Sequence, residues 1–385
     1  MPSDRQTVLY FSSFGNLRWG GQKSLYHLAT RLDRSVFRPH VVVPSDGGLA
    51  RKLAEKGVET CVFELPHLSP LCILRDLSAL RFLLRLLDDR GVALLHTDGP
   101  RNTFYAGLAA RLRGLPLVWH VRAMDSDPYD PILCRLATRV ILVADALRER
   151  FSGVCRADKL VTIHNGVDLG LFSSMPGQAC PESFALPPGR VIIGSAGRLE
   201  PQKGQITLIE TCGVLSGTGA DVHLVLVGES TDSSYERLCR RKAAEFGIAD
   251  RVTFAGHRDD MTAVLQAMDV FVLPSMIREA FPRAVIEAMA CGKPVIVTSG
   301  GGAPEAVERD RTGFVVPPGD SLALAGRLRL LVENPALRRT MGVAARRRAE
   351  DRFGLEKNAL RTQDLYRSLL AGKKHADRHV QSLRP

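Results

Sequence analysis

The sequence contains no long apolar run. No segment approaches the roughly 18 consecutive apolar residues that a membrane-spanning helix needs. Residues 1–15 also lack the hydrophobic core of a secretion signal. We therefore expect no membrane span, no export signal and a cytoplasmic location. Peripheral attachment to the inner face of a membrane stays compatible with this pattern.

Paired cysteines and metal-ligand clusters are missing as well. The eight cysteines are scattered along the chain, with no C-x-x-C pair and no grouping of His with Cys. This spacing excludes a disulfide framework and a zinc site, and it is typical of reduced thiols in a cytoplasmic protein. We expect no bound metal ion and no cofactor.

Acidic residues are too few to balance the basic ones. The chain has 41 Asp and Glu against 52 Lys and Arg, a net charge of +11. Such a charge suits nucleic acid, an anionic membrane surface or an acidic substrate. The sequence has no stripe of interleaved basic and aromatic residues and no known nucleic-acid-binding motif. Nucleic acid is therefore not an expected partner, whereas charge alone does not separate the other two classes.

What the sequence does contain is a regular alternation of short apolar runs with longer helix-like segments. With 385 residues, the chain is long enough for two domains that each bury a core. The expected strands of the first half are Val8–Phe11, His40–Val43, Thr60–Phe63, Ala93–His96, Leu117–His120 and Val140–Val143. Those of the second half are Val191–Ser195, Val222–Val227, Val252–Phe254, Val270–Leu273, Val295–Val297 and Gly313–Val316. The alternation predicts an α/β protein with parallel, doubly wound sheets, in which ligands bind at the carboxyl ends of the strands.

The segment 274–305 carries the strongest chemical pattern. Pro282 suits the first position of a helix, and Val285 begins an apolar stripe that Ala288 and Met289 continue. The start of this helix offers backbone N–H groups to a phosphate. Glu279 and Glu287, with seven residues between them, could accept hydrogen bonds from sugar hydroxyls. The alternative is that Glu287 pairs with Arg283 one turn back and that Glu279 is solvated.

In each half of the chain, a glycine-containing loop follows the first strand. In Gly197–Gly204, Arg198 and Lys203 could bind phosphate oxygens, although isolated basic residues are usually solvated. Gly20 and Gly21 precede a helix and would let a ligand approach the backbone closely, or they form a flexible turn. The sequence has no G-x-G-x-x-G, so it lacks the dinucleotide fingerprint.

His120 and Arg122 come at the end of the fifth expected strand. A doubly wound sheet exposes side chains to its crevice at this position. His120 is either a functional group or a hydrogen-bonded structural residue.

A leucine-rich helix at Leu71–Leu87 carries Arg75, Arg81 and Arg85. This helix either packs on the sheet with solvated arginines or docks on anionic lipid.

Together these segments resemble the retaining GT-B glycosyltransferases of family 4, the glycogen-synthase-like and mannosyltransferase group. The resemblance is carried by E-x-F-P-x-x-x-x-E-A-M-A-C-G-K-P-V from Glu279, G-G-x-P-E at Gly301–Glu305, and G-R-x-x-x-x-K-G at Gly197–Gly204. Many members have Gly where this chain has Pro282. The resemblance implies two facing Rossmann-like domains with the active site in the cleft between them. We place the acceptor-binding domain at 1–170 and the nucleotide-sugar-binding domain at 171–354. Residues 355–385 are expected to form a helix that crosses back to the first domain, followed by a basic tail.

The resemblance also implies the activity and the residues that perform it. The expected reaction moves a hexosyl unit from a nucleotide-diphosphate sugar to a glycan or lipid-linked acceptor, with retained anomeric configuration and without a metal. It implies catalytic roles for Glu279 and His120. It implies donor binding by Gly20, Gly21, Arg198, Lys203, Phe281 and Glu287. Asp125-Ser126-Asp127 spells the D-x-D of metal-dependent glycosyltransferases, but we interpret it here as a loop.

Three alternatives to this activity stay open. The chain could be another GT-B enzyme, such as a phosphorylase or an epimerase, or a non-catalytic sugar-nucleotide-binding protein. It could also be a basic nucleic-acid-binding protein. For the glycosyltransferase, the resemblance implies a role in bacterial cell-surface polysaccharide or glycolipid synthesis. The surplus of basic residues in residues 1–170 favours an acceptor near an anionic membrane.

Overall fold

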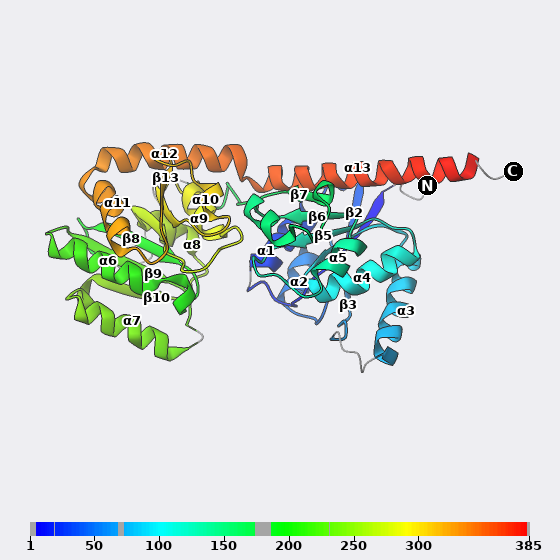
Figure 1. Ribbon diagram of the computed structural model, residues 1–385, viewed down its shortest axis with the longest axis horizontal. Coiled ribbons are helices and arrows are strands. Elements are labelled where there is room, and N and C mark those ends of the chain that lie inside the picture. The colour runs from blue at the N-terminus through cyan, green and yellow to red at the C-terminus, as the bar shows by residue number, and fades with distance from the viewer. Residues whose placement is uncertain (1–4, 19, 68–72, 174–185, 231, 383–385) are drawn as a thin grey trace. The chain divides into compact units, whose positions relative to one another are not determined.

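The computed structural model describes residues 5–18, 20–67, 73–173, 186–230 and 232–382 (Figure 1). The chain forms two compact units. Unit 1 combines Met1–Asn165 with Leu355–Pro385, and unit 2 is the continuous segment Gly166–Gly354. The chain thus passes between the units at 165/166 and at 354/355, whereas the sequence placed the first boundary at 170/171. The sequence from Ser173 to Gly189 is rich in Ser, Gly and Pro and is expected to be a linker, and its residues 174–185 lie outside the described residues.

Unit 1 is built on one seven-stranded parallel sheet. Its strands are β1 (Gln6–Phe11), β2 (Phe37–Val43), β3 (Glu59–Val62), β4 (Val92–Asp98), β5 (Leu117–Val121), β6 (Arg139–Leu142) and β7 (Leu160–Thr162). Their order across the sheet is β3-β2-β1-β4-β5-β6-β7. The direction of winding therefore reverses between β1 and β4, and ligands of doubly wound sheets bind beside such a reversal, at the carboxyl ends of the strands.

Helices cover both faces of this sheet (Figure 1). They are α1 (Gly20–Thr30), α2 (Gly48–Glu55), α3 (Ile73–Asp89), α4 (Pro100–Leu112), α5 (Asp130–Leu136) and α13 (Leu355–Ser382). One core joins α1, α2 and α13 to one face of β1, which contributes Val8 and Tyr10. A second core joins α3 and α4 to the opposite face through Leu9 and Phe11. Successive residues of a strand point to opposite faces, so a continuously apolar strand such as β1 can serve both cores.

Unit 2 repeats this architecture with a six-stranded parallel sheet. Its strands are β8 (Val191–Ala196), β9 (Val222–Val227), β10 (Val252–Gly256), β11 (Val270–Leu273), β12 (Val295–Thr298) and β13 (Gly313–Val316). The order is β10-β9-β8-β11-β12-β13, so the winding reverses between β8 and β11. The helices are α6 (Gln205–Gly217), α7 (Ser233–Glu245), α8 (Met261–Ala267), α9 (Arg283–Ala290), α10 (Ala303–Ala306), α11 (Ser321–Glu333) and α12 (Pro335–Arg352).

The expectation of an α/β protein with two doubly wound parallel sheets is confirmed. Every expected strand is present, with ends shifted by a few residues. The sequence missed β7, because its three residues are too few to show a pattern. Pro282 is the residue before helix α9 and has an extended ψ of 120°, so the helix begins one position later than expected. Val285, Ala288 and Met289 are fully buried, as expected for the core stripe.

Helix α3 packs part of its leucine-rich face on the sheet. Leu83, Leu86 and Leu87 belong to the core shared with α4, while Arg81 and Arg85 are exposed. The apolar face of α3 is therefore occupied by protein, and the interpretation as a packed helix is confirmed for the part that the structure describes. The side chain of Arg75 lies outside the described residues. Within them, none of the helices combines the length and the apolar character needed to cross a bilayer.

Candidate functional site

The two motif loops of unit 2 lie at the carboxyl ends of neighbouring strands. Gly197–Gly204 follows β8, and the segment that begins at Pro274 follows β11, which pairs with β8. These strands flank the reversal of winding in the sheet. Two segments about 75 residues apart in sequence therefore meet where a doubly wound sheet binds its ligands.

The backbone holds these two loops together. The N–H of Met276 donates a hydrogen bond to the carbonyl oxygen of Gln202 (2.9 Å). Gly204 has a φ of +68°, and a Cβ at this position would overlap the carbonyl oxygen of Pro274. Only glycine combines this left-handed backbone with so close an approach. The glycine of the K-G pair thus fixes the distance between the loops.

Lys203 and Glu279 form an ion pair across these loops. The Nζ of Lys203 lies 2.5 Å from Oε1 of Glu279, and the Ser275 hydroxyl donates to the same oxygen (2.6 Å). The two charged side chains are only 19% and 15% exposed. The alternative that Glu279 is simply solvated is therefore wrong. Both side-chain donors bind Oε1, which leaves Oε2 to accept hydrogen bonds from a ligand.

Arg198 occupies a more open position in the same loop. Its Nη2 lies 3.0 Å from Oε1 of Glu200, and its side chain is 49% exposed. The side-chain amide of Gln205 donates to the backbone carbonyl of Arg198 (2.8 Å), which secures the loop against the start of α6. A half-exposed guanidinium on an anchored backbone can exchange its contact with Glu200 for an incoming phosphate.

The second glutamate and the phenylalanine of the signature are committed to protein contacts. Glu287 pairs with Arg283 one turn earlier on α9 (Nε to Oε1, 3.4 Å), which is the alternative that the spacing allowed. The ring of Phe281 is 4% exposed and packs on Phe353, with ring centroids 5.5 Å apart. A donor could thus contact Phe281 only through its backbone. The ribose contact of Glu287 and the donor contact of Phe281 stay predictions.

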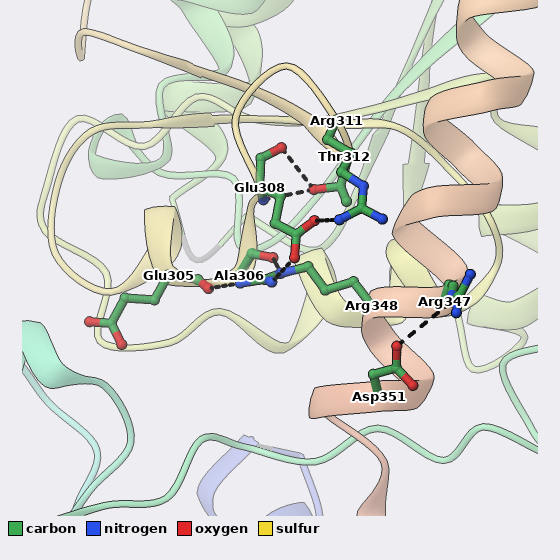
Figure 2. A network of polar contacts seen from close by, with 8 residues as sticks. All are labelled: Glu305, Ala306, Glu308, Arg311, Thr312, Arg347, Arg348 and Asp351. Carbon is green, nitrogen blue, oxygen red and sulfur yellow. Dashed lines mark hydrogen bonds and ion pairs between the residues drawn. The ribbon is translucent and has the colours of Figure 1, made fainter.

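The G-G-x-P-E segment lies against the backbone of Glu279. Gly301 has a φ of +69°, and a Cβ there would overlap the Glu279 carbonyl oxygen, which accepts a hydrogen bond from the N–H of Gly302 (2.7 Å). Arg348 of α12 anchors the next turn by donating to the carbonyls of Glu305 and Ala306 and to the carboxylate of Glu308 (Figure 2). The side chain of Glu305 extends away from this cluster in Figure 2.

Unit 1 has a cavity of about 420 Å³ at the carboxyl ends of its strands. It lies beside the reversal of winding between β1 and β4, where a doubly wound sheet binds ligands. Its lining includes Gly21 and Gln22 of α1, Asp98 at the end of β4, and His120 and Arg122 at and beyond the end of β5. Gly20, also predicted to bind the donor, is the first residue of α1 and so presents backbone at the helix start.

A buried carboxyl group forms part of this cavity wall. Asp98 accepts hydrogen bonds from the hydroxyl of Ser13 (3.1 Å) and the amide of Asn102 (3.4 Å). Burial raises the pKa of Asp98, while the nearby Arg122 opposes this shift. A Cβ at Gly21 would be in contact with Asp98 and Arg122, so a larger residue would enter the space beside them. A hydroxyl-rich ligand is the natural partner of such a carboxyl group.

His120 lines the same cavity and is also hydrogen-bonded. Its Nδ1 lies 3.1 Å from Nη2 of Arg122 and 3.2 Å from Nε2 of His96, while Arg122 Nη1 donates to Asn165 (3.0 Å). Burial lowers the pKa of His120 well below its ordinary value, and Arg122 and His96 lower it further. His120 is therefore a neutral imidazole at physiological pH.

The D-x-D sequence also reaches this cavity, whose lining includes Asp125 and Asp127. Asp127 accepts a hydrogen bond from the backbone N–H of Tyr129 (2.9 Å), which is a loop-forming contact. Over the part of the chain that the structure describes, no group of three or more His, Cys, Asp or Glu is placed to hold a metal ion.

Several polar residues at these sites were not predicted from the sequence. They are Ser275, which binds Glu279, and Asp98, Gln22 and His96, which lie at or beside the cavity of unit 1. Asp98 had a usable signal, because it ends an apolar strand at the edge where His120 also lies. His96 and Ser275 had none, since their roles depend on contacts between distant segments.

Comparison with known proteins identifies the two parts of the chain separately. Residues 20–171 match the model described as Glycosyltransferase Family 4, and residues 179–348 match Glycosyl transferases group 1. Among the relatives is a D-inositol 3-phosphate glycosyltransferase of Streptomyces scabiei, 31% identical over 71% of this chain and 67% of the relative. The capsular polysaccharide biosynthesis glycosyltransferase CapM of Staphylococcus aureus is 25% identical over 75% of this chain and 81% of the relative.

The chain covers only part of the length of each of these relatives. It covers 64% of the D-inositol 3-phosphate glycosyltransferase of Streptomyces avermitilis, to which it is 32% identical over 71% of its own length. It covers 68% of the 30% identical enzyme of Streptomyces coelicolor.

Solved structures share the fold. A glycosyltransferase from Rickettsia africae gives a TM-score of 0.87 at 20% identity, with 95% of this chain and 99% of that chain covered. Anabaena HepE in complex with UDP and glucose gives a TM-score of 0.80 at 23% identity, with 94% and 100% covered. The two matched models and the relatives agree with the two doubly wound sheets and their motif loops. This chain belongs to the glycosyltransferases that join a family 4 domain to a group 1 domain, and its fold is GT-B.

Proposed function

We propose that the chain transfers a hexosyl unit from a nucleotide-diphosphate sugar to a hydroxyl group of a glycan or lipid-linked acceptor, with retention of the anomeric configuration. The observation that carries this proposal is the ion pair of Lys203 and Glu279. An ammonium group and a carboxylate are held together, mostly buried, at the carboxyl ends of β8 and β11. This pair offers a cation for a leaving phosphate beside an acceptor for sugar hydroxyls.

The proposed chemistry consists of positioning and charge stabilisation. Lys203 keeps Glu279 in place with one of its three N–H donors and has the others for diphosphate oxygens. Arg198 can add a second cation, because its side chain is half exposed. Oε2 of Glu279 accepts from a hydroxyl of the transferred sugar. As the diphosphate departs, the negative charge that develops is then met by fixed positive groups, so no metal ion is required.

The proposed donor and acceptor classes rest on similarity. HepE of Anabaena has been crystallised with UDP-glucose, which supports a nucleotide sugar as donor. CapM of Staphylococcus aureus and the colanic acid glycosyltransferase WcaL of Escherichia coli are named for polysaccharide synthesis, which supports a cell-surface glycan or glycolipid as product. The exposed Arg81 and Arg85 of α3 support peripheral contact with anionic lipid through charge, since Leu83, Leu86 and Leu87 of this helix are buried in the core.

Donor binding is tested first, and transfer is tested second. Thermal shift with UDP-, GDP-, ADP- and dTDP-sugars identifies the donor, because a ligand of the folded state raises the melting temperature. Release of nucleoside diphosphate is then measured with and without an acceptor, and the anomeric configuration of the product is read by NMR. Acceptor-dependent release with retained configuration supports the proposal.

Three other outcomes would contradict it. Interconversion of the donor without an acceptor would indicate an epimerase, and phosphate-dependent release of a sugar phosphate would indicate a phosphorylase. Donor binding without any turnover across a broad acceptor panel would indicate a sugar-nucleotide-binding protein.

A further inference from the structure

We propose that Tyr366 and His96 are positioning residues that, together with Arg122, hold His120 with its proton on Nε2. In this form His120 serves the reaction as a hydrogen-bond donor to a ligand oxygen and not as a proton acceptor. The identity of that ligand rests on the proposed function, whereas the geometry rests on unit 1 alone.

A buried hydrogen-bonded chain of four rings leads from the last helix to the cavity. The Tyr10 hydroxyl on β1 lies 3.1 Å from that of Tyr366 on α13. The Tyr366 hydroxyl lies 2.5 Å from Nδ1 of His96 on β4, and Nε2 of His96 lies 3.2 Å from Nδ1 of His120 on β5. None of the four residues is more than 4% exposed. Solvent therefore has little access to this chain of contacts, and each ring depends on its neighbours for hydrogen bonds.

Arg122 determines which atoms donate and which accept in this series of hydrogen bonds. Its Nη2 lies 3.1 Å from Nδ1 of His120. A guanidinium group can only donate, so Nδ1 of His120 must present its lone pair and carry no proton. A neutral imidazole has one proton, and in His120 that proton is therefore on Nε2.

The same reasoning assigns the donors from His96 on β4 to Tyr366 on α13. Because Nδ1 of His120 is an acceptor, Nε2 of His96 must be the donor in their contact. His96 then has its lone pair on Nδ1, and the Tyr366 hydroxyl donates to it. Tyr366 in turn accepts from Tyr10. With the opposite tautomer of His96, two lone pairs would face each other between the histidines. The arrangement that avoids this repulsion has the single lone pair of His120 Nδ1 shared by the N–H groups of Arg122 and His96.

Charge states support this arrangement. Burial and the charge of Arg122 lower the pKa of His96 to about 3, so His96 stays neutral. Burial raises the pKa of Tyr366, which keeps its hydroxyl protonated and able to donate. Every member of the chain thus keeps one protonation state across the physiological range of pH.

Nε2 of His120 is the ring nitrogen that takes no part in this series of hydrogen bonds. Among the residues that the structure describes, Nε2 of His120 is buried and has no hydrogen-bond partner. An unpaired buried N–H is unfavourable for folding, and such groups are concentrated where a ligand supplies the missing partner. His120 lines the cavity of unit 1, so a hydroxyl oxygen of a ligand bound there is the partner that we infer.

The first test reads the tautomers directly. Two-bond ¹H–¹⁵N spectra of the full chain labelled with ¹⁵N-histidine distinguish a protonated ring nitrogen from a bare one, and His96→Gln and His120→Gln variants assign the signals. We expect both rings to be neutral at pH 7, with protons on Nε2. A proton on Nδ1 of His120, or an imidazolium at pH 7, would overturn the proposal whether or not any variant folds.

The second test removes the donor at the start of the chain. Tyr366→Phe keeps the buried ring but loses the hydroxyl. We expect the His96 signals to shift toward mixed tautomers and kcat/KM for transfer to fall about 2- to 10-fold, the contribution of one ordinary hydrogen bond. Affinity for free nucleoside diphosphate should not change, because that ligand lacks the transferred hexosyl group that we expect to contact His120. Unchanged histidine signals and unchanged transfer in Tyr366→Phe would refute the role of Tyr366.

Tyr105→Phe is the matched control. It removes another buried hydroxyl of unit 1, one that donates to Asp76 (2.6 Å) away from the cavity. We expect a loss of stability similar to that of Tyr366→Phe, with histidine signals and transfer unchanged. Equal effects of the two variants on transfer would show a structural role only. If the tautomers are as expected but no sugar is transferred, the proposed function fails and the positioning role stands.

Discussion

Lys203 and Glu279 are 76 positions apart in the chain, yet Nζ of the first lies 2.5 Å from Oε1 of the second. Each motif therefore supplies one half of a single charged pair. Lys203 can reach Glu279 only because Gly204 lets the two loops approach each other. The G-R-x-x-x-x-K-G and E-x-F-P segments therefore act together in unit 2.

Replacing Lys203 or Arg198 by Ala should weaken binding of the nucleotide sugar. Each change removes a charged donor from the Gly197–Gly204 loop, and a charged hydrogen bond contributes about 1.5–3 kcal/mol, or roughly ten- to a hundredfold in affinity. Titration calorimetry measures the effect. Arg241→Ala is the control, because it removes an arginine of unit 2 that is 67% exposed and pairs with Glu245 on α7. Wild-type affinity in both loop variants would contradict the phosphate assignment.

Gly204→Ala should destabilise unit 2 more than Gly219→Ala does. Both glycines have a positive φ, but only at Gly204 would a Cβ overlap backbone, the Pro274 carbonyl. Gly219→Ala costs the left-handed conformation alone, about 1–2 kcal/mol. Gly204→Ala should lose more and should also weaken donor binding, since it separates the two loops. Urea unfolding followed by circular dichroism compares the variants, and equal losses would show that the loops adjust without cost.

Transfer should survive removal of divalent metals. We expect this because Lys203 and Arg198 can balance the charge of the leaving diphosphate without a metal ion. The measurement is acceptor-dependent transfer after dialysis against EDTA. Loss of activity that Mg²⁺ or Mn²⁺ restores would show that a metal takes part, and Asp125 and Asp127 would then be the first residues to replace.

Binding to vesicles should depend on charge and not on an apolar face. Arg81 and Arg85 are exposed on α3, while Leu83, Leu86 and Leu87 are buried. We expect co-sedimentation with anionic vesicles at low salt, no binding to neutral vesicles, and about 30-fold weaker binding after Arg81→Glu with Arg85→Glu, because each basic residue contributes roughly 1 kcal/mol. Arg51→Glu with Lys52→Glu on α2 reverses the same charge elsewhere in unit 1. An equal effect there would remove the assignment to α3.

Unit 1 should lose stability as the pH falls below about 6.5. Burial lowers the folded-state pKa of His96 to about 3 and that of His120 well below its ordinary value, so these rings stay neutral while the unfolded chain takes up protons. The stability is complete above the unfolded pKa near 6.5 and is lost as the pH approaches the folded values, by up to about 1.4 kcal/mol per pH unit for each ring. Asp98 opposes the trend, because its raised pKa favours the folded state on acidification.

Tryptophan fluorescence is a suitable measurement, since both tryptophans, Trp19 and Trp119, belong to unit 1. Urea unfolding is followed at pH 7.5, 6.5 and 5.5. His96→Asn should reduce the slope with pH. The half-exposed His257 of unit 2 provides the control, His257→Gln, which should leave the slope unchanged. Equal slopes in His96→Asn and in the wild type would contradict the neutral state of His96, whatever Asp98 contributes.

The sequence predicted the strands and the signature helix well, because their signals are local. A strand buried on both faces, such as Val270–Leu273, reads as a continuous apolar run, and the stripe of α9 shows helical spacing within eight residues. The local pair of Arg283 and Glu287 was foreseen as an alternative for the same reason.

Contacts between distant segments were beyond such reasoning. The chemical environment of Glu279 depends on a loop 76 positions earlier, and that of His120 depends on Tyr366 in the last helix. Nothing in the residues around His96 indicates that it joins the two. Asp98 was accessible in principle, since it ends a strand next to the reversal of winding, but the order of strands had to be known first.

The division of unit 1 into two chain segments has a consequence for synthesis on the ribosome. Ala359 and Tyr366 belong to the same core as β1, β2 and α1, so that core is incomplete until the last helix has been translated. Unit 2 is continuous from Gly166 to Gly354 and has all its strands available earlier. Domains usually fold in the order of their translation. In this protein the nascent second unit can finish folding first, while the N-terminal segment waits for its final helix.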